Sequence, residues 1–162
     1  MATVDMKLAG PLKPTKHGKA ILTQAMFTKG NQFVAAALLL KQRGGYQYVV
    51  LHLICQGMEI LQKALLLAHN YDTFKPQIAD RKLFGHDLVR GADGVSAAYG
   101  FRRASGALRS ELEQLNRYYM QHRLRYASAT DILVDAHTMP YVRVLKRCTA
   151  LVRYGLKKIR VA

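Results

Sequence analysis

The chain has 162 residues and half of them are apolar, so it is long enough to bury the core of one domain. Its 25 lysines and arginines against 10 acidic residues give a formal charge of +15, which favours nucleic acid as a partner, then an acidic membrane or protein. The alternative is a basic surface without a specific partner. The only cysteines, Cys55 and Cys148, lie in apolar runs without CxxC spacing, which excludes an extracellular disulfide framework.

The N-terminal residues 1–18 are rich in proline, glycine and lysine and predict a flexible basic arm, which leaves residues 19–162 as a single domain. The arm lacks the apolar stretch of a signal peptide. The longest apolar zone, residues 48–68, is interrupted by polar side chains and is a poor membrane span. We therefore expect a cytoplasmic protein that does not enter a membrane.

The first predicted helix covers residues 19–42, with a break at Gly30, a buried half at FVAAALLL, and an end at Gly44. The second covers residues 46–70 and is the central helix of a bundle, because it is apolar except for one narrow polar stripe. The stripe consists of His52, Gln56, Glu59 and Lys63. It faces a neighbouring helix or water, or it forms a buried polar site around Glu59.

The second half of the chain predicts a loop and three further helices. Pro76 and Gly85 indicate a long loop over 71–85, and a short helix follows from about His86. The next helix starts near Ser105, or at Ser110 with a capping box to Glu113, and runs to Tyr126; the last runs from Pro140 to Arg160. No strand-like alternation persists, so the predicted fold is an all-α, antiparallel bundle of about five helices.

The last predicted helix is basic on one face and apolar on the other. The apolar face is formed by Val142, Leu145, Cys148, Leu151, Val152, Leu156 and Ile159. We expect this face to complete the bundle, which favours nucleic acid over a membrane as the partner of the basic face. The candidate nucleic-acid-binding residues on this helix are Arg143, Arg147, Lys157 and Lys158.

The stretch LNRYYMQHRLRY, residues 115–126, carries groups that suit RNA cleavage without a metal. Such cleavage needs a proton acceptor, a proton donor and a cation near the phosphorus. An imidazole can transfer protons near neutral pH, a guanidinium can hold a phosphate, and a phenol ring can stack on a base. The candidates are His122 for proton transfer, Arg117, Arg123 and Arg125 for phosphate, and Tyr118 for a base. RNA contact without catalysis, or a structural stripe that includes His122, remains open.

Four segments, in this order, resemble the HEPN domain family: QFVAAALLL, YQYVVLHLICQGMEILQKALLLAHNYD, KLFGHDL and LNRYYMQHRLRY. The resemblance implies a helical bundle, commonly a homodimer. It implies a metal-independent RNase of a toxin–antitoxin or defence system, without metal or cofactor. The alternative that it leaves is a non-catalytic module that binds nucleic acid or an acidic protein, such as a nucleotidyltransferase or an antitoxin.

The RNase signature of this family is an arginine followed after four to six residues by a histidine on a late helix, and Arg117 with His122 is similar to it. Tyr118 stands where the family often has a small polar residue. Residues five apart on one straight helix point about 140° away from each other. Arg117 and His122 would therefore meet one phosphate only across a groove or a dimer interface. A second pair with this spacing, Arg81 and His86, straddles the predicted loop.

Overall fold

The computed structural model describes residues 15–80, 82–126 and 133–159, and within these ranges the chain is helical, with no strand. Six α-helices and one 3₁₀-helix are assigned there: α1 Lys16–Gln42, α2 Gln47–His69, α3 Tyr71–Ala79, α4 Leu88–Tyr99, α5 Gly106–Met120, η1 Ala136–Thr138 and α7 Val142–Lys158. The predicted all-α bundle is confirmed. The predicted N-terminal arm lies outside the described residues, apart from its last four residues.

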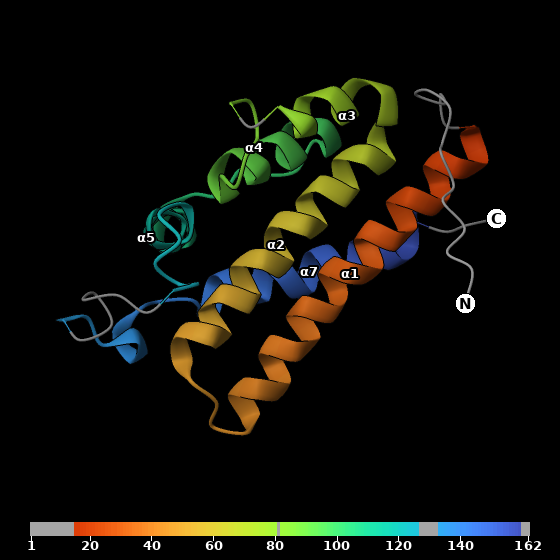
Figure 1. Ribbon diagram of the computed structural model, residues 1–162. Coiled ribbons are helices and arrows are strands. Elements are labelled where there is room, and N and C mark those ends of the chain that lie inside the picture. The colour runs from red at the N-terminus through yellow and green to blue at the C-terminus, as the bar shows by residue number, and fades with distance from the viewer. Residues whose placement is uncertain (1–14, 81, 127–132, 160–162) are drawn as a thin grey trace, which may run out of the picture.

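Helix α2 is the centre of the bundle. It contacts α1, α3, α4, α5 and α7, and Figure 1 shows α1 beside it, α4 and α5 on its other flank, and α7 passing behind. Leu51, Ile54, Leu61 and Leu65 on α2 are fully buried. Helix α2 is long and apolar enough to cross a membrane by composition alone, but 72% of its most apolar window is buried inside the bundle.

Helix α1 continues through Gly30 without the predicted break. Gly30 instead permits α1 to pack closely on α2, because a Cβ atom there would lie 3.0 Å from the backbone nitrogen of Leu61. Gly57 on α2 makes the reciprocal contact, since its Cβ would lie 2.7 Å from a methyl group of Val34. The break was predicted because glycine weakens a helix, whereas here helix packing outweighs that preference.

The predicted buried half of α1 is only partly buried. Val34 and Ala37 face the core, while Leu38 and Leu39 are exposed. Helix α1 also begins earlier than predicted, at Lys16, because the Thr15 hydroxyl accepts a hydrogen bond from the backbone N–H of Gly18 at 3.0 Å.

Residues 71–79 form helix α3 and not the predicted loop. Asn70 caps its N-terminus by accepting a hydrogen bond from the N–H of Thr73 at 3.0 Å. The ring of Phe74 and the side chain of Ile78, both on this helix, pack against the core. Capping and packing together outweigh the destabilising effect of Pro76, which removes one backbone hydrogen-bond donor within the helix.

Helices α4 and α5 differ from the prediction at their ends. Helix α4 begins at Leu88, and Asp87 is its N-cap, with the carboxylate accepting from two backbone N–H groups. Helix α5 begins after Ser105, so the predicted capping box at Ser110 is wrong. It ends at Met120, and the chain turns at His122, whose φ of 58° lies in the left-handed region. Residues 121–126 are therefore not part of the helix.

Helix α7 packs on the bundle through Val144, Cys148, Leu151 and Gly155. Gly155 lies against the ring of Phe27 on α1. The N-terminus of α7 is held by Glu111, which is buried in α5 and accepts a hydrogen bond from the N–H of Val144 at 2.9 Å. The prediction that Val142 and Leu156 belong to the buried face is wrong, since they are 49% and 55% exposed.

Candidate functional site

The carboxylate of Glu59 on α2 is the centre of a polar cluster. Its side chain is 7% exposed, and it accepts hydrogen bonds from three different segments. Lys63 Nζ on α2 lies 2.6 Å away, His86 Nδ1 ahead of α4 lies 3.0 Å away, and the Tyr119 hydroxyl of α5 lies 2.5 Å away. The polar stripe of α2 is thus a buried polar site at Glu59, which is one of the alternatives from the sequence.

The segment ahead of α4 is fastened to this cluster by further hydrogen bonds. Lys63 Nζ also donates to the backbone oxygen of Gly85 at 2.7 Å. Asn116 on α5 accepts from the N–H of Leu88 at 2.8 Å and donates to the carboxylate of Asp87 at 3.0 Å. These bonds fix the backbone on both sides of His86, so the position of its ring is set by α2 and α5.

The cluster keeps Glu59 ionised and Tyr119 neutral. Burial opposes ionisation of Glu59, but the hydrogen bonds from Lys63, Tyr119 and His86 outweigh it and hold the pKa of this carboxyl below its ordinary value. Burial and the neighbouring Glu59 carboxylate raise the pKa of Tyr119. The Tyr119 hydroxyl is therefore a hydrogen-bond donor to Glu59 and not a proton-transfer group.

Two imidazoles lie together at the solvent edge of the cluster. The ring centroids of His86 and His122 are 6.0 Å apart, with an angle of 74° between the rings. The side chain of His86 is 49% exposed, and His122 is also exposed. Because Nδ1 of His86 faces Glu59, its other ring nitrogen, Nε2, is not engaged by the carboxylate. Both rings are accessible to a ligand from solvent.

His52 and Arg125 extend the cluster. The His52 ring lies 5.9 Å from that of Tyr119, and its buried Nδ1 has no hydrogen-bond partner among the described residues. Burial, followed by the positive charge of Arg125, lowers the pKa of His52. Arg125 is exposed and close enough to Tyr119 to act on its ionisation as well. A guanidinium group therefore lies near His52 and Tyr119.

The predicted pair of Arg117 and His122 does not share one helix, because α5 ends before His122. The structure brings His122 to His86, whereas Arg117 lines a separate hollow of about 280 Å³ with Tyr118 and Arg123. The guanidinium of Arg123 lies 6.0 Å from the centroid of the Tyr118 ring. The helical geometry that set these two residues about 140° apart does not apply to the turn.

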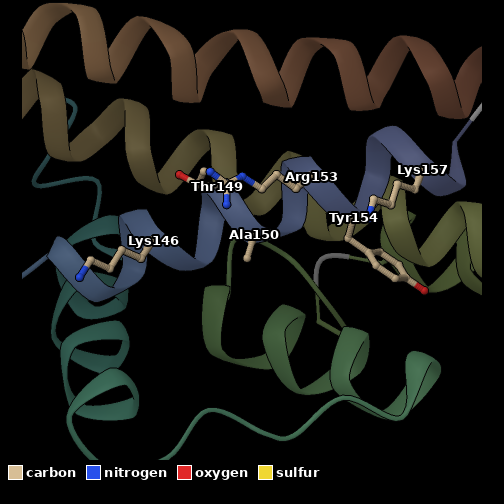
Figure 2. Close-up of a pocket in the computed structure, with 6 residues that line it drawn as sticks. All are labelled: Lys146, Thr149, Ala150, Arg153, Tyr154 and Lys157. Atoms are coloured by element: carbon tan, nitrogen blue, oxygen red, sulfur yellow. The ribbon is translucent and has the colours of Figure 1, made fainter.

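The predicted basic residues of α7 lie in different settings, and Arg147 among them is only partly exposed. Arg143 is paired with Glu111 at 3.4 Å. The Arg147 guanidinium lies 5.9 Å from the ring centroid of Phe101, and Lys158 Nζ lies 5.9 Å from that of Tyr154. Lys157 lines a hollow of about 490 Å³ (Figure 2), with Lys146, Thr149, Ala150, Arg153 and Tyr154.

Site prediction from the sequence missed His86 and Tyr119 as members of the Glu59 cluster. Glu59 and Lys63 were recognisable as a pair one helical turn apart. His86 and Tyr119 were not, because only the tertiary packing of α4 and α5 on α2 brings them to the carboxylate. The hollow that Lys146 and Arg153 line on α7 was not predicted.

The described residues include no group of three or more His, Cys, Asp or Glu side chains arranged to hold a metal ion. The chain matches no family model, no curated protein and no solved structure.

Proposed function

We propose that this protein is a HEPN-type RNA-binding domain that cleaves RNA without a metal at His86 and His122. One observation carries the proposal: two exposed imidazoles lie 6.0 Å apart at one edge of the bundle, and one of them is held by a buried carboxylate. Imidazole is the side chain that most readily both accepts and donates protons near neutral pH. Two such groups provide the acid and the base that phosphodiester cleavage needs.

The reaction is an internal transesterification of RNA. His122 accepts the proton of a ribose 2′-hydroxyl, and the 2′-oxygen forms a bond to the adjacent phosphorus. The bond between phosphorus and the 5′-oxygen of the next nucleotide breaks, and protonated His86 donates its proton to that oxygen. The products are a 2′,3′-cyclic phosphate and a 5′-hydroxyl end, and no other reactant is consumed.

Glu59 supports the assignment of His86 as the acid. Its carboxylate is bonded to Nδ1 of His86, which orients the ring and leaves Nε2 as the nitrogen available to a substrate. Tyr119 and Lys63 hold Glu59 in place through their own hydrogen bonds. Arg125, whose charge acts on His52 and Tyr119, is the cation that we assign to the developing charge on the phosphate.

The excess of positive charge supports RNA as the ligand. The chain carries a formal charge of +15. Among the described residues, no acidic side chain pairs with Arg117 or Arg123, which line a hollow of their own, or with Arg125. Unpaired surface cations attract the phosphate backbone and make its binding salt-dependent.

The test is cleavage of a 5′-fluorescent single-stranded RNA in the presence of EDTA. We expect wild type to cleave it, and His86→Ala and His122→Asn each to reduce the rate by about 10²- to 10⁴-fold. Asn is chosen at position 122 because it tolerates the left-handed backbone conformation. His17→Ala, at an exposed position on α1, is the matched control and should retain the wild-type rate. Absence of cleavage by wild type would refute the enzymatic proposal.

A second substrate distinguishes the acid from a merely structural histidine. RNA with a bridging 5′-phosphorothiolate has a sulfur leaving group that needs no protonation. We expect this substrate to restore the rate of His86→Ala but not that of His122→Asn. Equal defects of both variants on this substrate would contradict the assignment of His86 as the acid. A 2′-deoxy substitution at the cleaved linkage should abolish the reaction, because the attacking oxygen is missing.

Both imidazoles come from one chain. This histidine pair therefore does not need residues from a second copy. We keep the homodimer, the antitoxin or nucleotidyltransferase partner and the cytoplasmic location as proposals that follow from the family resemblance. They are tested by the oligomeric state of the purified protein and by co-purification.

A further inference from the structure

A second basic feature lies on α7, on residues that the proposed reaction does not use. Its exposed side carries a hollow of about 490 Å³, and Figure 2 shows the side chains that line it along the helix. Lys146, Arg153 and Lys157 supply the charge, and Tyr154 supplies a ring. Thr149 and Ala150 also line the hollow.

The spacing of the cations suits an extended phosphate chain. Lys146, Arg153 and Lys157 are separated by seven and four residues, which places them near one side of the helix. The distance along the helix from Lys146 to Lys157 is about 16 Å at 1.5 Å per residue. Several consecutive phosphates of one nucleic-acid strand span such a length.

These cations are not used for holding the fold together. Among the described residues, Arg143 is the only cation of α7 that forms an ion pair with an acidic side chain. Lys146, Arg153 and Lys157 are exposed, and no ion pair occupies them in the part of the chain that the structure describes. They are therefore available to an anionic ligand.

Tyr154 adds an aromatic ring in a fixed position. Its ring makes edge contacts with Tyr99 and Phe101, at centroid distances of 5.2 Å and 4.9 Å. These contacts limit the rotation of the ring, so little freedom is lost when a ligand packs against it. A fixed aromatic ring between cations is the combination with which proteins bind single-stranded nucleic acid.

We infer that this hollow is a binding subsite for single-stranded RNA, in which Lys146, Arg153 and Lys157 contact consecutive phosphates and Tyr154 contacts a base. The inference rests on the proposed function only for the choice of RNA as ligand. It adds a second place of contact on α7, with a single strand and not a duplex as the preferred form, because a base inside a duplex does not expose its face.

The test measures binding by fluorescence anisotropy, with a labelled 12-nucleotide single-stranded RNA, in EDTA and in a His122→Asn background that does not cut the probe. The test variant is Lys146→Gln/Arg153→Gln/Lys157→Gln. Its matched control is Lys29→Gln/Arg43→Gln/Lys75→Gln, which removes the same charge from exposed positions elsewhere. Binding is measured over a range of NaCl concentrations, and a duplex of the same sequence is the comparison ligand.

We expect the α7 variant to bind the single strand at least tenfold more weakly than the control variant. The slope of log affinity against log salt should fall in magnitude by about 2, since each phosphate contact on a single strand contributes about 0.7. Tyr154→Leu, which keeps apolar bulk beside Phe101, should weaken binding of the single strand by about 5- to 150-fold and affect the duplex less.

The outcomes separate this inference from the proposed function. Equal binding by the α7 variant and the control variant would overturn the inference, and cleavage by wild type would still support the proposed function. Normal RNA binding that depends on α7, without cleavage by wild type, would support the inference and refute the reaction. Loss of binding to phosphatidylserine vesicles in the α7 variant, with RNA binding unchanged, would overturn the inference in favour of a membrane surface.

Discussion

The imidazole of His86 and the carboxylate of Glu59 lie 3.0 Å apart, although 27 positions separate them in the sequence. This contact joins the segment ahead of α4 to the central helix α2. It also directs one ring nitrogen of His86 inward and leaves the other for solvent. The same bond therefore contributes to the stability of the fold and to the arrangement of the proposed catalytic histidines.

Glu59→Gln should reduce the free energy of unfolding by about 2 kcal/mol, because hydrogen bonds to a buried ionised group contribute about 1.5–3 kcal/mol. Glutamine keeps the shape of the side chain but leaves Lys63 without its counter-charge. Urea unfolding at pH 7 measures the effect. Glu113→Gln is the control: Glu113 pairs with Arg109 but is 52% exposed, so its loss should cost no more than about 0.5 kcal/mol.

The effect of Glu59→Gln should also depend on pH. The pKa of Glu59 is lower in the folded chain than its ordinary value of 4.5. The stabilisation from its charge is thus fully present above pH 4.5 and is lost as the pH falls through the folded pKa. Unfolding measured from pH 7 down to pH 3 should show the two proteins converging. A constant difference across this range would contradict the assigned role of the charge.

Tyr119→Phe should separate positioning from catalysis. The variant loses the hydroxyl that donates to Glu59, while the ring next to His86 remains, at 6.1 Å between centroids. We expect stability to fall by about 1–2 kcal/mol and the rate of RNA cleavage to fall less than in His86→Ala. The 5′-phosphorothiolate substrate should restore much of this rate, since Tyr119 acts through the proposed acid. Unchanged kinetics would show that Glu59 needs no support from Tyr119.

The effect of His52→Leu on stability, relative to wild type, should be more favourable at acidic than at neutral pH. Burial, followed by the charge of Arg125, lowers the pKa of His52 from 6.5. Wild type therefore has its full stability above pH 6.5 and loses part of it as the pH falls through the lowered pKa. The melting temperature of His52→Leu relative to wild type should rise between pH 7 and pH 5. His17→Leu controls for removal of an imidazole at an exposed position.

The sequence predicted the bundle and its central helix correctly, because both follow from local patterns. The apolar surface of α2 with one polar stripe is enough to identify a helix surrounded by others. The ends of helices were less predictable. Asn70 caps α3 and Thr15 caps α1. These capping residues favour a helix, whereas the nearby proline or glycine residues favour a loop, and only tertiary packing decides which of the two forms.

The candidate site shows the same division between local and tertiary information. His122 was recognisable from its neighbours in LNRYYMQHRLRY, and it is exposed. Its partner His86 was not recognisable, because the two histidines are far apart in the sequence. The predicted helix, which continued to Tyr126, also gave His122 a different orientation from the one that it has in the turn. The left-handed backbone conformation of His122, in the turn after α5, has no clear sequence signal, because glycine or asparagine is the usual residue in that conformation.

Gly57→Ala should destabilise the bundle. A Cβ atom at this position would lie 2.7 Å from a methyl group of Val34 and 3.1 Å from its backbone nitrogen. Forcing α1 and α2 apart should cost about 1–3 kcal/mol, although alanine is the better helix former. Gly94→Ala is the comparison, because its nearest contact is 3.3 Å from the Phe84 ring. Urea unfolding should show a clearly larger loss for Gly57→Ala.

Cys55 and Cys148 should be unreactive in the folded protein. Both are fully buried, and burial raises the pKa of each thiol, that of Cys148 to about 12. A thiol reacts as its thiolate, so both accessibility and ionisation oppose modification. A thiol-specific reagent such as Ellman's reagent should label neither residue in buffer and both in urea. Rapid labelling of the native protein would contradict the packing of α7 against α2.

The close pairing of α1 and α2 also has a consequence for how the chain folds. These helices are consecutive and joined by residues 43–46, so their mutual contacts form without closing a long loop. Helix α7 docks on the same hairpin from the other end of the described chain. We therefore expect the hairpin to be organised in the folding transition state, whereas the contact of Gly155 with Phe27 forms late and governs the rate of unfolding.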